Sequence, residues 1–554
     1  MNLPEPQTRT FAGLVVEIEK GQIKIPQFQR DFVWTMQRSA GLVDSIIKGY
    51  PIGTFIFWRT KERLRSVKDL GKQVLPDPEQ GELVDYVLDG QQRLTSLFAS
   101  LRGVTIIRED GKEDDFSKIF IDLNAEDSDQ IVITDIEGKD VSSLISIFKL
   151  LTGGLKLLGT YPEHYHDKLD TYKQRIEAYQ YSIILVKDAP IDIATEIFTR
   201  INVGGKPLSL FEIMAAKTFD YEKNFDLSEK FQELIDNLKP FNYETISDAT
   251  VLQIVSIILS KECKRQVILQ LNKDEFIGIW EQTMDSIKRT VGYFRDSYRI
   301  PVSQLLPYNA LVVAFSYFFF HHRDKPTGDK QKYLEDFFWR CSLSGRYSSA
   351  VESKLAQDVK RIDQILAGEL PSYDWSIDTS EEFIKNNGWF SAARSYIKAI
   401  LCIYSYHQPK SFNDNAIVNI NNYWLKQANS KNYHHFFPKA HLKKRDYGDF
   451  RINHILNITI VDDFLNKRVI GAKAPSIYMT QFQSNPDLTS TMMTHLIGDL
   501  NTFGIWDDNY DKFFDERAKI VSCELSKRII KQEVDRKGQA NLVDDFDEEL
   551  TTVE

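Results

Sequence analysis

The chain has 554 residues, of which 42% are hydrophobic, 27% charged and 12% aromatic, and its net charge is −10. At roughly 100 to 200 residues per domain this length predicts several domains, and the near-average composition excludes a mainly disordered, collagen-like or repeat-array chain. The acidic charge argues against a protein that coats nucleic acid along its whole surface. The four cysteines are far apart, which excludes a C-x-x-C zinc pair and a dense disulfide framework and favours a reducing cytosol.

The first 220 residues mix short apolar runs with amphipathic stretches, which predicts α+β structure. Strands are expected over 55–58, 83–88, 106–110, 118–123 and 181–188, and helices over 38–49 and 191–202. The amino terminus has no basic-then-apolar signal, and the longest apolar run is well short of the ~20 residues that span a bilayer. We therefore expect a cytoplasmic protein with no membrane contact.

The remaining chain predicts three further segments. Helical periodicity dominates 221–405 and predicts a helical middle domain. Strand and turn signals return in 406–490 around a cluster of histidines. The last segment, 491–554, is expected to be a helical stretch with an acidic tail, which has six acidic residues and no base after Lys537.

Four of the ten histidines fall within 21 residues: His434, His435, His441 and His454. The local order predicts a strand that ends at Pro438, a second strand over 455–461, and a short helix after it that ends at Gly471. The surrounding segment, 431–468, holds eight Lys or Arg against four Asp, an excess of +4 that suits nucleic acid. The alternative is a half-buried hairpin with ordinary surface histidines.

Strand, loop, strand and helix, with His-His at the end of the first strand and Asn on the later elements, resembles the His-Asn-His (ββα-metal) nucleases. More specifically it resembles the carboxy-terminal domain of GmrSD-type, modification-dependent (type IV) restriction enzymes. The resemblance implies that His435 is the general base and that His434 and Asn466 hold one divalent metal, Mg²⁺ or Mn²⁺. Adjacent strand residues point to opposite faces, so the two histidines can share a site only if the strand bends there.

The resemblance also implies that an asparagine orients the base, and that lysines contact the phosphate. Asn457 is the expected orienting residue, because a polar side chain in the middle of an apolar strand needs a reason, and Asn453 competes for this role. Lys467 and Lys473 are the expected phosphate contacts. The other two histidines of the cluster are expected to be surface or packing residues.

A second candidate site lies where a buried strand, an Asp89-Gly90 turn and an amphipathic helix follow one another. Gln91, Gln92 and Arg93 then occupy the first helical turn, where free N–H groups, the helix dipole and a guanidinium suit a phosphate. Asp-Gly is also a common turn and Arg a common surface residue, so a purely structural role for this segment stays open.

Three segments together, IPQFQRDFVW (25–34), DGQQR (89–93) and FTRINVGGKPLSLFE (198–212), resemble the amino-terminal ParB-like domain of the same GmrSD family. In the last of them, Ser209 and Glu212 predict a capping box at the start of a helix. The resemblance implies a nucleotide-binding pocket, able to hydrolyse an NTP, that is lined by Arg30, Asp89, Gly90, Gln91, Gln92, Arg93, Asn202 and Lys206.

The leading hypothesis is a prokaryotic anti-phage defence endonuclease that cuts modified phage DNA with a metal-dependent His-Asn-His site. Its ParB-like domain, residues 1–220, would bind an NTP or sense modified DNA and license cleavage, and a homo-oligomer stays open. The competing hypothesis is an NTP-dependent regulatory or DNA-sensing protein whose nuclease domain is vestigial.

Overall fold

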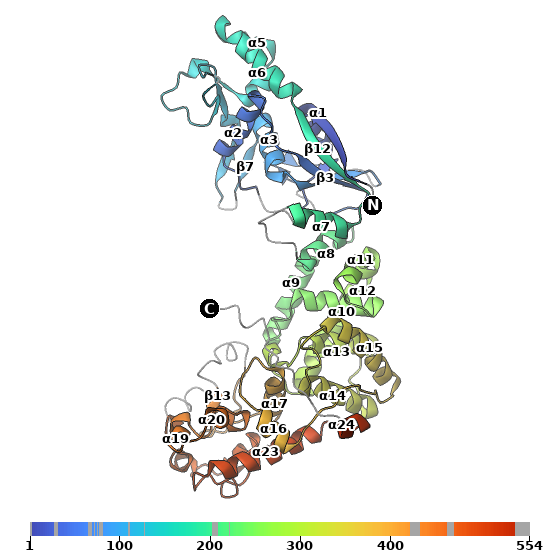
Figure 1. Cartoon of the computed structure of the whole chain (residues 1–554), viewed down its shortest axis with the longest axis vertical. Helices are drawn as coiled ribbons and strands as arrows, with labels where there is room; N and C mark the ends of the chain where they lie inside the picture. The colour runs from blue at the N-terminus through green and yellow to red at the C-terminus, as the bar shows by residue number, and fades with distance from the viewer. Residues whose placement is uncertain are drawn as a thin grey trace. The chain divides into compact units, whose positions relative to one another are not determined.

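The computed structural model describes residues 3–26, 32–64, 69–70, 73–74, 76, 81–108, 111–126, 128–201, 209–220, 222–420, 433–461 and 470–537. It divides into two compact units, residues 1–227 and 228–554 (Figure 1). Both helices and sheets are present, which confirms the predicted α+β class. The finer boundaries at 220, 405 and 490 stay predictions.

The first unit is built on a five-stranded mixed sheet with the order β1 (Glu5–Thr10), β12 (Gln180–Lys187), β3 (Phe55–Thr60), β6 (Val84–Asp89) and β2 (Ile23–Lys24). β12 is parallel to β3 and β2 is parallel to β6, whereas the β1–β12 and β3–β6 pairs are antiparallel. The central strands β3 and β6 bury most of their residues, so they form the floor of the core. The predicted strands over 55–58, 83–88 and 181–188 are confirmed.

The helices that contribute apolar faces to the core of this unit include α1 (Phe11–Glu19), α2 (Met36–Ile47), α3 (Gln91–Arg102) and α6 (His166–Ala178). A three-stranded sheet in the order β10 (Val132–Ile133), β9 (Phe120–Asp122) and β11 (Leu144–Ser146) closes the same core. The other elements are β4 (Asp69–Leu70), β5 (Gln73–Val74), β7 (Thr105–Ile107), β8 (Glu113–Asp115), η1 (Phe116–Lys118), η2 (Val141–Ser143), α4 (Ile147–Thr152), α5 (Gly154–Leu158), η3 (Glu163–Tyr165), α7 (Ile191–Ile201) and α8 (Leu210–Thr218).

Local capping fixes where several of these helices begin. The hydroxyl of Thr10 accepts a hydrogen bond from the Gly13 amide at the start of α1. At the start of α8, the Ser209 hydroxyl accepts from the Glu212 amide and the Glu212 carboxylate accepts from the Ser209 amide. These bonds satisfy amides that have no partner inside the helix. The predicted Ser209–Glu212 capping box is confirmed.

The second unit begins with a helical assembly around α13 (Ala310–His321), an apolar helix that is buried along nearly its whole length. α10 (Asp248–Ser260), α12 (Lys273–Asp296) and α15 (Val351–Ala367) pack against it. A helix that is apolar on all sides is stable in water only when neighbours surround it. The other helices of this part are α9 (Leu227–Leu238), η4 (Lys239–Phe241), α11 (Arg265–Gln270), η5 (Ser303–Leu305), α14 (Gly328–Leu343), α16 (Glu381–Asn387) and α17 (Ser395–Tyr406).

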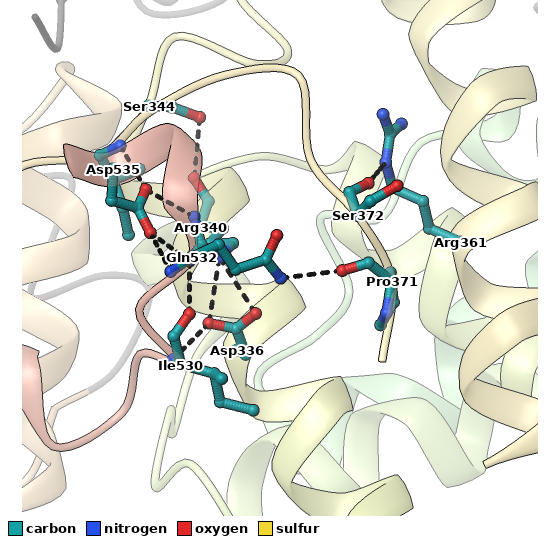
Figure 2. A network of polar contacts seen from close by, with 10 residues as sticks. Asp336, Arg340, Ser344, Arg361, Pro371, Ser372, Ile530, Gln532 and Asp535 are labelled. Carbon is teal, nitrogen blue, oxygen red and sulfur yellow. Dashed lines mark hydrogen bonds and ion pairs between the residues drawn. The ribbon is translucent and has the colours of Figure 1, made fainter. Parts of the chain in front are cut away.

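A buried ion network attaches the last described helix, α24 (Glu533–Lys537), to α14 (Figure 2). Arg340 is fully buried, and its Nη1 and Nη2 donate to the two carboxylate oxygens of Asp535 at 2.9 and 2.6 Å. Its Nε donates to Asp336, and Nη2 also donates to the carbonyl of Ile530 at 2.6 Å. A buried charge is tolerated only when it is paired and hydrogen-bonded, so this network fixes the position of α24.

The described elements that follow the histidine segment along the chain are α21 (Pro475–Met479), η8 (Thr480–Phe482), α22 (Leu488–Thr494) and α23 (Tyr510–Ser526). All four cysteines are free thiols; three are buried, and Cys523 is exposed. No helix within the described ranges is long and apolar enough to cross a membrane.

Candidate functional sites

The histidine cluster lies on a short hairpin in which β13 (Tyr433–His435) pairs antiparallel with β14 (Ile458–Ile460). Between these strands the chain forms α19 (Lys439–Lys443), α20 (Asp449–Ile452) and η6 (Ile455–Asn457). The second strand is therefore shorter than predicted, because its first three residues form a 3-10 turn. The helix predicted to follow it falls largely on 462–469, outside the described residues.

His434 and His435 lie on opposite faces of this hairpin, because the register is regular over all three pairs of β13 and side chains alternate along a paired strand. The His434 side chain is buried, with its ring edge-on to Tyr478 at 6.3 Å between centroids. The His435 side chain is half-buried. The bend that would turn both side chains to one site is not seen within β13.

His435 is hydrogen-bonded to Asn453, and Asn453 is in turn hydrogen-bonded to the backbone of Phe390. The His435 Nε2 lies 3.1 Å from Asn453 Oδ1, and Asn453 Nδ2 donates to the Phe390 carbonyl at 3.2 Å. The Phe390 amide in turn donates to the Asn453 carbonyl at 2.9 Å. Because the amide NH₂ of Asn453 is directed to Phe390, its oxygen faces the imidazole, so we assign the proton to Nε2 and the lone pair to Nδ1.

Burial, and next the positive charge of Lys439, lower the pKa of His435 to about 4, while the hydrogen bond to Asn453 opposes the shift. At neutral pH the imidazole is therefore uncharged. An uncharged imidazole with a fixed tautomer has one nitrogen that can take a proton, which is the property that a general base requires.

Of the two asparagines that the sequence offered, Asn453 makes the contact with His435, and Asn457 holds the hairpin together. Asn457 is fully buried; its Nδ2 donates to the carbonyls of Phe437 and Ile452, at 3.0 and 3.1 Å, and its Oδ1 accepts from the Phe437 amide at 2.9 Å. These bonds satisfy backbone groups where β13 leaves the hairpin. In the structure the orienting contact expected of Asn457 is thus made by Asn453.

His454 is a packing residue, as predicted. It is fully buried, its Nδ1 accepts from the Leu456 amide at 3.1 Å, and its ring packs against Phe514 with 4.7 Å between centroids. Burial lowers the pKa of His454 to about 3. His441 is half-buried on α19.

The segment Gly388-Trp389-Phe390, which directly follows α16, was not predicted to belong to this site. It docks on the hairpin region through the Phe390–Asn453 bonds, a bridge between Trp389 and His454, and a 2.8 Å bond from the Ile455 amide to the Gly388 carbonyl. A Cβ on Gly388 would lie 2.1 Å from the His454 ring, so the close approach needs glycine. The only sequence signal is a Gly followed by two aromatic residues after a helix.

The second candidate site begins where β6 ends at Asp89. Gly90, with φ +92°, makes the turn, and α3 begins at Gln91, as predicted. A Cβ on Gly90 would lie 2.5 Å from the Phe55 ring, so glycine is required for space as well as for φ. Gly90 has no side chain to cap the first-turn amides of α3.

Arg93 has a structural role at this turn. Its Nη1 donates to the Ile52 carbonyl at 2.8 Å, and its Nη2 donates to the Thr54 carbonyl and to Asp89 Oδ2, both at 3.0 Å. Next to it Gln92, which is buried like Gln91, accepts from the Val33 amide at 2.9 Å. Arg93 therefore ties the 52–54 loop to the start of α3, whatever it does for a ligand.

Several predicted site residues lie outside the described part of the chain: Arg30, Asn202, Lys206, Asn466 and Lys467. Lys473 is described, and its side chain is exposed. Among the described residues no group of three or more His, Cys, Asp or Glu could hold a metal ion. The metal site and the nucleotide pocket therefore stay predictions.

Comparison with known proteins supports the resemblance over the first unit. Residues 11–219 match the family model described as GmrSD restriction endonuclease, N-terminal domain. An uncharacterized protein of Methanocaldococcus jannaschii is 25% identical over 549 residues, covering 87% of this chain and 88% of the relative. Because the aligned share is longer than either compact unit, that similarity extends into both.

Proposed function

We propose that this chain is a prokaryotic anti-phage defence endonuclease of the GmrSD type that cuts modified DNA in the cytoplasm, with His435 as its general base. The observation that carries the proposal is the Phe390–Asn453–His435 chain of hydrogen bonds, which fixes one tautomer of an uncharged imidazole. The match of residues 11–219 to a restriction endonuclease domain supports the defence role.

In this proposal Nδ1 of His435 accepts a proton from the water that attacks the phosphorus, while its Nε2–H stays hydrogen-bonded to Asn453 Oδ1. A base with a pKa near 4 is weak, but a bound phosphate brings negative charge beside it. That charge favours the imidazolium form and raises the pKa toward neutrality. The base would then be strengthened only when DNA is in place.

A divalent metal ion, Mg²⁺ or Mn²⁺, completes the proposed site and would stabilise negative charge on the phosphate. The ligands predicted for it from the sequence are His434 and Asn466. His434 lies on the hairpin face opposite His435, so a metal held there would share a phosphate with this base only after β13 rearranges. An imidazole nitrogen with an amide oxygen is a donor set that suits Mn²⁺ at least as well as Mg²⁺. Lys467 and Lys473 would add positive charge toward the phosphate oxygens.

The amino-terminal unit is proposed to bind an NTP at the Asp89–Arg93 turn and to control cleavage. The support is the start of α3, where Gly90 is the N-cap residue in the left-handed region and the helix dipole has its positive end. Arg30, Asn202 and Lys206 are proposed to complete this pocket.

The proposal is tested by cleavage of modified phage DNA and unmodified plasmid, with Mg²⁺ or Mn²⁺ and with each NTP. His435→Ala should lower the rate by about 10²- to 10⁴-fold, because the base acts in the transition state. His441→Ala, from the same segment but outside the proposed machinery, is the matched control. Cleavage by the His435 variant within about threefold of wild type would remove this residue from the mechanism.

The same assay distinguishes an active nuclease from the competing function, a regulatory or sensing protein. A protein that binds an NTP and modified DNA, but cuts neither substrate with either metal, would be a regulatory or sensing protein with a vestigial nuclease domain. Asn466→Ala should raise the metal concentration needed for half-maximal cleavage, and an unchanged titration would give the ligand role to another residue.

A further inference from the structure

Two exposed aromatic side chains stack on each other, and they belong to the two segments that contain Phe390 and Asn453. The rings of Trp389 and Phe450 lie 6.1 Å apart at an angle of 23°, and they remain 38% and 41% exposed. Single exposed aromatic residues are ordinary on protein surfaces. A stacked pair that stays exposed needs another account, because burial of both rings would stabilise the fold further.

The pair is held rigidly. Phe450 belongs to α20, and its ring contacts His454 at 5.5 Å between centroids; Trp389 forms its backbone bridge with the same His454. The fully buried His454 ring packs on Phe514 behind them. The two rings therefore lie on backbone that is held by the contacts with His454. Because these contacts already order the rings, little conformational entropy is lost when a ligand stacks on them.

The position of the pair links it to the base. Trp389 directly precedes Phe390, whose carbonyl accepts a hydrogen bond from Asn453. Phe450 lies three residues before Asn453 in the chain. The Phe390 ring turns inward, with its centroid 4.8 Å from that of Tyr433 in β13, while Trp389 remains exposed. Asn453 therefore connects the two features: its side chain bonds His435 and the residue next to Trp389, and its own segment carries Phe450.

The segment that carries Phe450 has a charge opposite to that of the whole chain, although two of its cations are paired: Lys443 with Asp449 at 3.7 Å and Arg451 with Asp511 at 2.8 Å. Residues 433–461 carry five Lys or Arg and two Asp, whereas the full chain has a net charge of −10. Lys443, Lys444 and Arg445 are exposed at the end of α19 and just after it. Aromatic rings flanked by cations are the combination that binds an unpaired nucleic acid strand, since bases stack on the rings and phosphates pair with the cations.

We propose that Trp389 and Phe450 form a stacking platform for an unpaired base of the DNA strand that is cut. The proposal rests on the nuclease function above, and it names the substrate as a strand with at least one base out of the duplex. A purely double-helical substrate keeps its bases stacked on each other and cannot use such a platform unless a base is displaced.

The test measures binding rather than cleavage, so that it is independent of the nuclease assignment. Fluorescent single-stranded oligonucleotides, duplexes, and an abasic strand of equal length are titrated with the full chain without added metal. Trp389→Ala should weaken single-strand binding by about 5- to 100-fold. Trp389→Tyr, which keeps a ring, should restore most of it, and Phe241→Ala, another exposed aromatic of the second unit, should have no effect.

The abasic strand should bind the wild type about as weakly as the normal strand binds Trp389→Ala. Equal binding of normal and abasic strands, or unchanged binding by Trp389→Ala, would overturn the platform. A change in self-association without a change in DNA binding would also overturn it and would make the pair a contact between copies. If the platform binds bases but His435→Ala cuts normally, the platform stands and the proposed base fails.

Discussion

The ion network that holds α24 allows a stability prediction that does not depend on function. Asp535→Ala removes both carboxylate oxygens that pair with the guanidinium of Arg340, at 2.9 and 2.6 Å. The Arg340 side chain is fully buried and that of Asp535 is only 9% exposed, so solvent cannot replace the lost contacts without entering the core. The variant leaves the guanidinium of Arg340, whose native contacts are drawn in Figure 2, buried with fewer compensating contacts.

The size of this cost depends on the contacts that Arg340 keeps. Removing one partner of a buried ion pair costs about 3–5 kcal/mol. Arg340 keeps Asp336 at 3.0 Å and the Ile530 carbonyl, which places the cost at the lower end. The amides of Ile377 and Gln532 also lose their acceptor. We expect the free energy of unfolding of the second unit to fall by about 3 kcal/mol.

Urea unfolding, monitored by tryptophan fluorescence, measures this change, because six of the eight tryptophans belong to the second unit. Deleting 533–554 should cost nearly the same as Asp535→Ala if Asp535 is the main anchor of α24. Lys519→Ala, which breaks an exposed pair with Glu516, is the control and should cost under about 0.5 kcal/mol. A loss below about 1 kcal/mol for Asp535→Ala would refute the buried-charge reasoning.

Histidines with lowered pKa values and a crowded glycine give two further predictions. Burial lowers the pKa values of His435, His454 and His495 to about 4, 3 and 4, so the unfolded state, with pKa values near 6.5, binds more protons below that pH. The free energy of unfolding should not depend on these groups above about pH 6.5 and should fall as the pH drops toward 4, by up to about 1.4 kcal/mol per pH unit for each histidine. Urea unfolding at several pH values measures this dependence, and a flat profile would contradict it. Gly53 has φ +89°, and a Cβ there would lie 2.1 Å from Arg93 Nη1, so Gly53→Ala should destabilise the first unit by about 2–4 kcal/mol. In thermal unfolding, the double variant with Arg93→Ala should lose less stability than the sum of the two single variants, because Arg93→Ala removes the clash.

The periodicity of the sequence was sufficient for the central elements of the fold and insufficient for its edges. β3, β6 and α12 carry apolar residues at the spacing that their burial requires, so pattern alone predicts them. β1, with the sequence EPQTRT, is mostly exposed or half-buried and has no apolar alternation. It becomes a strand because its backbone pairs with β12, which lies far along the chain at Gln180–Lys187. Such long-range pairing leaves no local signal.

The two asparagines of the hairpin show why the candidate site could be located from the sequence but not resolved. A polar residue among Ile and Leu must be satisfied when buried, which correctly marked Asn457 as unusual. The pattern cannot say whether that satisfaction comes from a neighbouring histidine or from backbone, and in the structure it comes from Phe437 and Ile452. The orienting contact belongs to Asn453, whose amide is aligned by a carbonyl 63 residues away in the chain. The tautomer of the proposed base is therefore set by a contact that only the folded chain creates.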